Sequence, residues 1–330
     1  MQVTETGQIA TSLKSETVFS LNRIHAEQLE QQLQTSRKDL AQHVIKTVQW
    51  ARKLSGYEPP LQMHEPVFTG RMQRDGYVIE KYFLQGEGSY IIPYLLLKPD
   101  KPGHKALLYV HPSGKQAEAV EGGEMEWFVK KGFTVLAPDL IGVGEMGPGV
   151  FEGDSYIKGV SYNVWFASML VGKSIVGVRA GDVVRLAQVL QKKENAQAIY
   201  GLAKKEMAPV LVHAAAFDST IKNVALIEPY TSYRAVVMNR FYNPAFIYST
   251  VPNALTAYDL PDLAASLAPR KLVIANATDG AGNQSDPKSR DEDFSVIKAA
   301  YQHKKTSEQL DIIPGKPAGN NFDLYLEWIE

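Results

Sequence analysis

The region after about Pro60 alternates short apolar runs with helix-periodic segments, and this alternation restricts the fold more than any other feature. The expected strands, which contain these runs, are residues 78–84, 91–98, 105–110, 133–137, 196–200, 223–227, 271–275 and 308–313. Helical segments are expected at residues 124–131, 174–191, 206–217, 291–301 and 322–330. Strands that alternate with helices in this way form parallel sheets with right-handed crossovers. The first two runs flank a glycine-containing turn at residues 85–89, which is typical of a hairpin. The sequence therefore predicts an α/β fold whose eight-stranded, mostly parallel sheet is flanked by helices.

Residues 1–60 are polar and rich in glutamine, and they differ from the rest of the chain. Apolar residues recur there at helical spacing, at Leu29, Leu33, Leu40, Val44, Val48 and Ala51. Ser36 with Asp39 offers a capping box in the middle, so we expect two consecutive helices. The predicted organisation is an N-terminal linker and helical arm at residues 1–60, followed by one domain at residues 61–330. The arm either packs on that domain or docks a partner.

Composition excludes several classes of function. The 330 residues are 45% hydrophobic, which suffices for one large α/β domain, and the net charge of −1 gives no electrostatic reason to bind nucleic acid or an anionic membrane. No stretch approaches the roughly 20 apolar residues that span a bilayer. Cysteine is absent, which excludes disulfides and thiolate chemistry, and the seven histidines lack metal-ligand spacing. Gly142-Val143-Gly144 lacks the third glycine of a dinucleotide site. We therefore expect neither a metal nor a cofactor.

Several motifs resemble landmarks of one superfamily. Residues 105–114 are similar to the third strand and oxyanion loop of α/β-hydrolases, residues 137–144 to their P-D-x-x-G-x-G turn, and residues 271–279 to the seventh strand leading to the triad acid. With the segments 177–182, 213–218 and 258–263, the chain from about residue 60 to 330 resembles bacterial acetyl xylan esterase-like proteins. The likeness is to the second, degenerate hydrolase module of longer two-module chains. This resemblance implies a crevice beyond the carboxyl ends of the strands, covered by a cap-like insertion at about residues 229–258.

Serine hydrolases of this fold carry the nucleophile on a tight strand-to-helix turn, G-x-S-x-G. Here the turn is expected at Gly201-Leu202-Ala203-Lys204-Lys205, which places the nucleophile position on Ala203 and the second glycine on Lys205. Alanine has no group that attacks a carbonyl.

The other triad members are also in question. The loop expected to supply the base, residues 314–322, contains no histidine. The acid position falls on Asp279, with Glu228 as the alternative site after the sixth strand, and Asp279 is equally suited to holding a loop. The resemblance therefore implies a serine esterase family, whereas these residues predict that the serine triad is lost.

Ser113 is the best remaining hydroxyl, because it follows His111. The loop of His111, Ser113 and Gly114 normally donates backbone N–H groups to an oxyanion, so a nucleophilic role for Ser113 is the weaker alternative. Lys204 acts as a base only if burial lowers its pKa. His213 lies in an apolar helix, where a core histidine is the usual interpretation.

Aromatic side chains are candidates to line the crevice. We expect Trp127, Tyr230, Tyr233 and Arg234 to contact substrate, since aromatic faces stack on sugar rings and arginine binds hydroxyls or uronates. Further candidates are Trp165, Asn239, Tyr242 and Tyr248. The alternative is that these aromatic residues form packed core beneath a cap.

Three hypotheses follow. The first is a catalytically silent module that binds acetylated xylan or another carbohydrate, or supports an adjoining esterase module. The second is an active carbohydrate esterase that uses Ser113, and the third is a purely structural assembly module.

The linker-like residues 6–13 and the lack of a signal-peptide pattern lead us to expect a piece of a longer protein. A xylan-acting parent would be periplasmic or secreted. The sequence leaves the substrate and the oligomeric state open.

Overall fold

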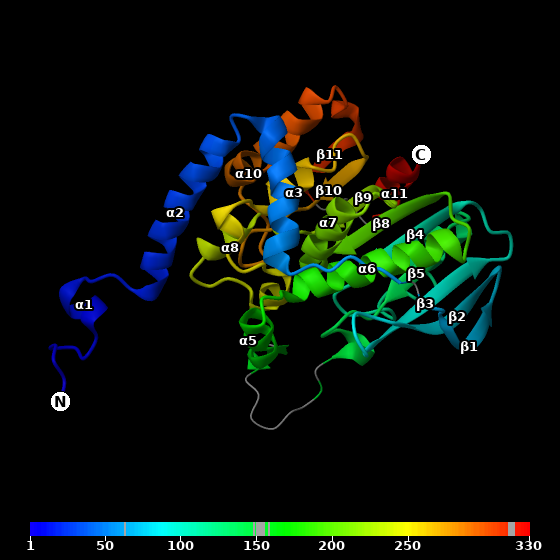
Figure 1. Cartoon of the computed structure of the whole chain (residues 1–330), viewed down its shortest axis with the longest axis horizontal. Coiled ribbons are helices and arrows are strands. Elements are labelled where there is room, and N and C mark those ends of the chain that lie inside the picture. The colour runs from blue at the N-terminus through cyan, green and yellow to red at the C-terminus, as the bar shows by residue number, and fades with distance from the viewer. Residues whose placement is uncertain (63, 148, 150–155, 158, 316–320) are drawn as a thin grey trace.

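The computed structural model describes the chain except for residues 63, 148, 150–155, 158 and 316–320. Its centre is a nine-stranded sheet with the order β1-β2-β3-β5-β4-β8-β9-β10-β11 (Figure 1). The strands are β1 Val67–Arg74, β2 Tyr77–Gln85, β3 Ile91–Pro99, β4 Lys105–Val110, β5 Thr134–Pro138, β8 Ala198–Lys204, β9 Ile221–Ile227, β10 Leu272–Ala275 and β11 Leu310–Ile313.

Strand pairing confirms the predicted class. From β5 through β4, β8, β9 and β10 to β11, every neighbouring pair is parallel, whereas β1, β2 and β3 pair antiparallel. The predicted strand count is one too low, because β1 was not foreseen. Six of its eight residues are exposed, so β1 lacks the buried positions that mark the other strands in the sequence.

Two layers of helices cover the sheet. Successive residues of one strand face opposite layers, as Leu107 and Leu108 do in β4, where each belongs to a different hydrophobic cluster. One cluster joins the sheet to α6 Ile175–Lys192, α7 Ala208–Phe217, α9 Leu260–Ala265 and α10 Pro287–His303. The other joins it to α4 Glu124–Lys130 and α11 Phe322–Ile329. Because the strands are parallel, their carboxyl ends lie along the same edge of the sheet, between the two helical layers.

The arm consists of α1 Ile9–Leu13, α2 Val18–Ser36 and α3 Leu40–Ser55. α3 crosses over α6 and α7, while α2 extends away with α1 at its far end (Figure 1). The two predicted helices are present, and the cap between them is Asp39, whose carboxylate accepts the N–H of Gln42 at 3.3 Å. Ser36, expected to cap, ends α2 instead.

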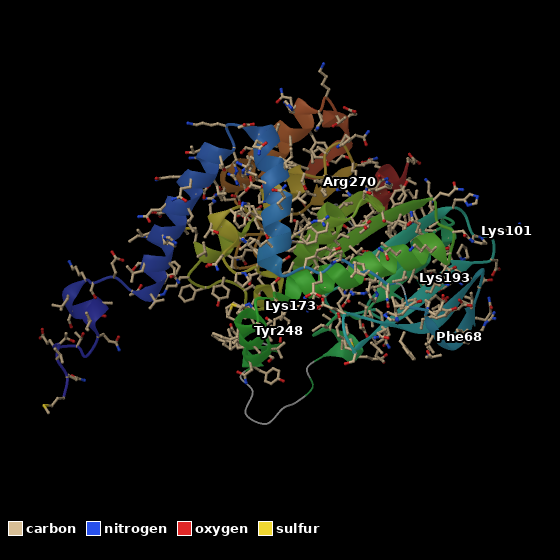
Figure 2. The ribbon with its side chains drawn as sticks, in the orientation of Figure 1. Phe68, Lys101, Lys173, Lys193, Tyr248 and Arg270 are labelled. Atoms are coloured by element: carbon tan, nitrogen blue, oxygen red, sulfur yellow. The ribbon has the colours of Figure 1, made fainter. Side chains whose placement is uncertain are left out.

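The stretch at residues 229–258 forms short helices: α8 Tyr233–Val237, η3 Pro244–Ser249 and η4 Ala254–Thr256. A second segment, which the sequence did not indicate, packs against it and contains β6 Tyr156–Ile157, β7 Val160–Ser161 and α5 Tyr162–Leu170. Tyr248, labelled near α5 in Figure 2, joins the two segments by donating its hydroxyl to the Ser161 carbonyl at 2.8 Å. Within the described residues, no helix has both the length and the apolar character needed to span a membrane.

Candidate functional site

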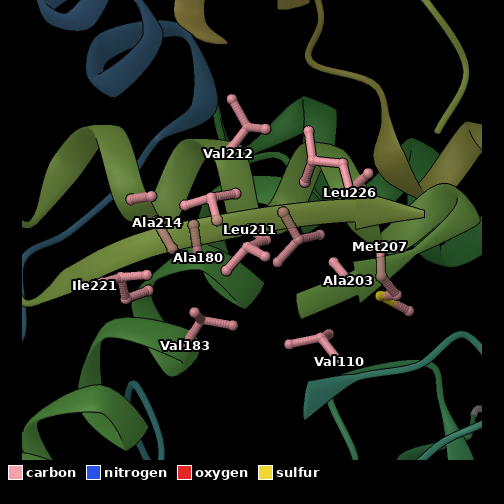
Figure 3. Close-up of a cluster of buried hydrophobic side chains, with 14 of the residues drawn as sticks. Val110, Ala180, Val183, Ala203, Met207, Leu211, Val212, Ala214, Ile221 and Leu226 are labelled. Carbon is pink, nitrogen blue, oxygen red and sulfur yellow. The ribbon is translucent and has the colours of Figure 1, made fainter. Parts of the chain in front are cut away.

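The sharp turn after β8 lies at Lys205, two residues later than predicted. Ala203 is inside the strand, paired with Val110 and Leu226, and its side chain is fully buried. Figure 3 shows it in the hydrophobic cluster beside Met207. Lys205 has φ +51°, a conformation that side chains with a Cβ rarely adopt, and α7 follows directly after one 3₁₀ turn, η2 Lys205–Met207. The expectation that Ala203 occupies the tight turn is therefore wrong.

Lys205 faces an acidic residue from the neighbouring strand. Its Nζ lies 3.9 Å from Oε2 of Glu228, and 56% of the lysine side chain is exposed. Glu228 directly follows β9 and also has a positive φ, +54°. The carboxyl ends of β8 and β9 thus present a lysine and a glutamate where the fold is suited to holding a hydroxyl nucleophile.

Glu206, which directly follows Lys205, is a second acidic residue beside Glu228 at this turn. Burial raises the pKa of Glu206, while a hydrogen bond from its own backbone N–H and the charge of Arg179 act in the opposite direction. A backbone N–H at this position normally binds the oxyanion in hydrolases of this fold. In this chain the N–H belongs to an acidic residue, whose carboxylate would repel an oxyanion.

The carboxylate of Asp139 holds the loop after β4 in place. Gly114 has φ +87°, and a Cβ there would lie 2.5 Å from Oδ1 of Asp139. That carboxylate accepts the N–H of Lys115 at 2.8 Å and the N–H of Glu145 at 2.9 Å, and it binds the Lys115 ammonium at 2.5 Å. The P-D-x-x-G-x-G turn therefore fixes the position of the loop.

His111 and Ser113 interact through the backbone. The N–H of Ser113 donates to Nδ1 of His111 at 3.0 Å. Burial lowers the pKa of His111 to about 4, with the charge of Lys204 acting in the same direction, so the imidazole is neutral at pH 7. Its Nδ1 lone pair accepts the backbone N–H, which leaves this nitrogen unable to take a proton from the Ser113 hydroxyl.

Lys204 belongs to a polar cluster that sequence reasoning missed. Its Nζ lies 2.8 Å from Oε1 of Glu124, and the hydroxyls of Tyr109 and Tyr325 donate to Oε2 of the same carboxylate at 2.7 and 2.8 Å. The cluster joins β4, β8, α4 and α11. The Lys204 side chain is thus held by Glu124 and is not directed at a substrate.

Asp279 and His213 have structural roles. Oδ1 of Asp279 accepts the N–H groups of Ala281 and Asn283 at 2.8 and 2.9 Å, which stabilises the loop after β10. His213 is fully buried, its ring nitrogens lie 2.7 Å from the Pro209 carbonyl and 2.9 Å from the Tyr258 hydroxyl, and burial lowers its pKa to about 4. The loop predicted to lack the base, residues 314–322, lies partly outside the described residues.

The four predicted substrate contacts do not form one site. Tyr230 and Tyr233 are 2% and 5% exposed, and both hydroxyls donate to the Ser249 carbonyl, at 2.9 and 3.2 Å. Trp127 stacks on Phe322 at 5.4 Å between ring centroids.

Arg234 pairs with Glu30 at 3.0 Å and Asp293 at 2.9 Å. The expectation that these four side chains contact a ligand together is corrected, because they pack the core, brace the C-terminal helix and anchor the arm.

A polar pocket of about 340 Å³ lies where β9 and β10 end. Its lining residues are Glu228, Asn276, Thr278, Gly282 and Gln284. Sequence reasoning missed the last four, although polar residues directly after buried strands were the available signal. In the part of the chain that the structure describes, no group of three or more histidine, aspartate or glutamate residues is placed to hold a metal ion.

A chain of Ser36, His43 and Asp262 lies outside this crevice. Ser36 Oγ is 3.1 Å from Nδ1 of His43, and Nε2 of His43 is 2.9 Å from Oδ1 of Asp262. These are the residue types of a catalytic triad. However, Arg37 binds both oxygens of the carboxylate at 2.7 and 2.8 Å, and the Ser36 hydroxyl also donates to the Leu33 carbonyl at 2.9 Å. The cluster anchors the arm to α9.

Comparisons with known proteins agree on the fold. No protein-family model matches the sequence, and no curated protein matches it. A solved structure from Bacteroides fragilis, assigned as an acetyl xylan esterase, matches with a TM-score of 0.66 at 18% identity, covering 86% of this chain and 77% of that one. Acetyl xylan esterase 1 from Thermoanaerobacterium sp. matches with a TM-score of 0.56 at 15% identity, covering 88% and 92%. A glucuronoyl esterase from Solibacter usitatus matches with a TM-score of 0.56 at 13% identity, covering 82% and 86%.

At these identities the likeness concerns the fold, and the mostly parallel sheet flanked by helices agrees with it. The protein is therefore an α/β-hydrolase-fold protein that resembles acetyl xylan esterases and other carbohydrate esterases in structure.

Proposed function

We propose that this chain is a catalytically silent α/β-hydrolase module that binds carbohydrate, or supports an adjoining esterase module, without hydrolysing esters. The observation that carries the proposal is the identity of the residue on the sharp turn after β8, which is Lys205. Lys205 offers no hydroxyl to attack an ester, and its Nζ lies 3.9 Å from the carboxylate of Glu228.

The loop after β4 supports the same conclusion. An oxyanion hole depends on N–H groups aimed at the site where negative charge develops. The Ser113 N–H of this loop donates to His111 at 3.0 Å. With this donor engaged, a tetrahedral intermediate would be poorly stabilised even if another hydroxyl attacked.

The polar pocket beside Glu228 supports binding. Glu228, Asn276, Thr278 and Gln284 offer carboxylate, amide and hydroxyl groups, which are the groups that bind sugar hydroxyls. The carbohydrate esterases with the same fold make an acetylated xylo-oligosaccharide the first ligand to test. Supporting an adjoining module is compatible with this pocket but has no separate observation in its favour.

The test combines turnover with binding. The purified chain and its Ser113→Ala variant are incubated with p-nitrophenyl acetate and acetylated xylo-oligosaccharides, and we expect phenol and acetate release at the rate of buffer alone. Binding of the same oligosaccharides is measured by calorimetry, and Gln284→Ala is expected to weaken it about fivefold, as loss of one hydrogen-bonding group does. Gln302→Ala, on the exposed surface of α10, is the matched control.

Three results would contradict the proposal. Turnover that disappears in Ser113→Ala would identify an active esterase with that nucleophile. Turnover that persists in the variant would place a nucleophile elsewhere. Absence of both turnover and binding would contradict carbohydrate binding and leave the chain as a supporting, structural or assembly module.

A further inference from the structure

A second hollow, separate from the crevice, lies between α2 and the insertion at residues 229–258. Its volume is about 550 Å³, which is within the range of small-molecule sites. We name it the arm–cap groove. The described residues that line it are Val18, Phe19, Asn22, His25, Ala26, Leu29, Tyr233, Val236, Val237, Asn239, Arg240, Tyr242, Thr250, Val251, Asn253, Ala254, Leu255 and Thr256. It shares no lining residue with the polar pocket at the ends of β9 and β10.

The groove has an apolar floor. Ala26 and Leu29 contribute from α2, and Val236 and Val251 contribute from the insertion. Each of these side chains is buried or half-buried, so the arm and the insertion both offer apolar surface there. A ligand body that removes such surface from water gains about 25 cal/mol per Å². The floor therefore fits the apolar part of a small molecule.

One arginine, Arg240, lies at the rim of the arm–cap groove. Arg240 is exposed, and it lines both this groove and the adjoining hollow that contains Asp279 and Asp286. In the described part of the chain Arg240 forms no ion pair within 4.0 Å, whereas Arg23 pairs with Glu27 and Arg234 pairs with Asp293. The Arg240 guanidinium lies over the exposed Phe241 ring, 5.6 Å from its centroid. It has no carboxylate partner among the described residues, so it is the arginine of this region that is available to an incoming anion.

The carboxylates near Arg240 have other hydrogen-bond partners. No aspartate or glutamate is among the described residues that line the arm–cap groove. In the adjoining hollow, Asp279 accepts two backbone N–H groups of its own loop, and Asp286 accepts the N–H of Ser289 at 2.9 Å as the cap of α10. Asp293, which also lines that hollow, binds Arg234 and accepts the Ser232 hydroxyl at 2.8 Å. These carboxylates are engaged by other donors, so within the described residues Arg240 has no carboxylate partner.

From the apolar floor and the single unpaired guanidinium we propose that the arm–cap groove binds an amphipathic organic anion, an aromatic or acyl body that carries one carboxylate. A guanidinium forms two parallel hydrogen bonds with a carboxylate, which fixes the anionic end at the rim. The body then lies along α2 and bridges the arm to the insertion. This binding would make the orientation of the arm depend on a small molecule.

The experiment uses 2-naphthoate as the anionic probe and 2-naphthylmethanol as its uncharged counterpart, with affinities measured by calorimetry on the full chain. The expected result is that the wild-type chain binds the carboxylate about tenfold more tightly than the alcohol, the size of one partly exposed charge contact. Arg240→Gln should abolish that preference and leave the affinity for the alcohol unchanged. Arg23→Gln, which removes an arginine already paired with Glu27, is the matched control and should preserve the preference.

Asn22→Trp locates the site, because Asn22 is an exposed lining residue and a tryptophan there fills the groove without disturbing the core. This variant should lose both probes while its thermal unfolding stays unchanged. The proposal is overturned if neither probe binds, if both bind equally to the wild type, or if the preference for the carboxylate survives in Arg240→Gln. It is also overturned if xylo-oligosaccharide displaces 2-naphthoate, which would make the groove a neutral sugar site.

Discussion

Lys205 has a backbone conformation that is usual for glycine. Its φ of +51° brings Cβ close to the backbone, at a cost of roughly 1–2 kcal/mol for a residue with a side chain. The neighbouring Glu228 has the same feature, with φ +54°. Two strained residues side by side at the ends of β8 and β9 maintain the sharp turns of the fold although the lysine does not supply a nucleophile.

The strain at Lys205 gives a prediction about stability. Lys205→Gly should be about 1 kcal/mol more stable to urea unfolding than Lys205→Ala, because the two variants differ only in the Cβ that clashes at positive φ. Comparing these two variants removes the effect of losing the ammonium group near Glu228.

The same pair of substitutions at Lys298 is the control. Lys298 lies inside α10 with an exposed side chain, so glycine there should be about 1 kcal/mol less stable than alanine. Equal stability of the two Lys205 variants would show that the turn carries no strain.

At the scale of elements, the arm depends on a few polar contacts. Asp262 of α9 has a fully buried side chain and accepts from Arg37 and His43. Burial acts to raise the pKa of Asp262, but the hydrogen bonds from His43 and Arg37 outweigh it and hold the pKa below its ordinary value. A second ion pair, between Arg234 and Glu30, joins α2 to α8. These contacts fix a polar arm that has few buried apolar residues of its own.

Asp262→Asn tests this anchor. The variant leaves Arg37 and His43 beside an uncharged amide, and removing one partner of a buried ion pair costs about 3–5 kcal/mol. We expect that loss of unfolding free energy at pH 7, measured with urea, together with faster proteolytic cleavage in residues 1–55. Asp291→Asn, which removes an exposed partner of Lys298, should change stability by less than about 0.5 kcal/mol.

Acid titration gives a further check on the same variant. A carboxyl group whose pKa is lowered in the folded state contributes stability above its unfolded pKa, about 3.9, and loses it as the pH falls through the folded value. The difference between wild type and Asp262→Asn should therefore be full at pH 6 and shrink below about pH 4. A difference that does not change with pH would mean that the carboxylate charge is not what anchors the arm.

At the scale of the whole molecule, the C-terminal helix completes one face of the sheet. Trp328 of α11 is 1% exposed, and its ring lies 5.3 Å from Tyr200 and 6.4 Å from Phe128 between centroids. Its Nε1 is buried and has no hydrogen-bond partner among the described residues. The helix is therefore held by apolar packing and by the Tyr325 hydroxyl on Glu124.

Trp328→Ala is expected to lower the free energy of unfolding by about 3–5 kcal/mol, since it leaves a large cavity between α11 and the sheet. Trp328→Phe keeps most of the ring contacts and removes the unpartnered N–H, so it should cost less than about 1.5 kcal/mol. Both values are measured by urea unfolding. A phenylalanine variant as unstable as the alanine variant would show that the indole N–H has a partner.

The class of fold could be predicted from the sequence. A buried strand such as residues 272–275 is recognised locally because it is apolar on both faces, and a helix such as α6 is recognised by its periodicity. The order of these elements was enough to predict a mostly parallel sheet. The edge strand β1 was not predicted because an exposed strand need not be apolar.

Which side chains lie at the site could be learned only from the three-dimensional structure. Where β8 ends depends on how far its neighbours extend, since Ala203 and Lys204 remain in the strand by pairing with Leu226 and Ile227 of β9. The sharp turn was therefore displaced by two residues from the position that motif spacing suggested. Tyr230 is buried for a related reason, because η3, further along the same insertion, accepts its hydroxyl at the Ser249 carbonyl, 19 residues away. Burial and strand length are set by partners distant in the sequence, so residue types alone fixed the sheet and left open which side chains face its crevice.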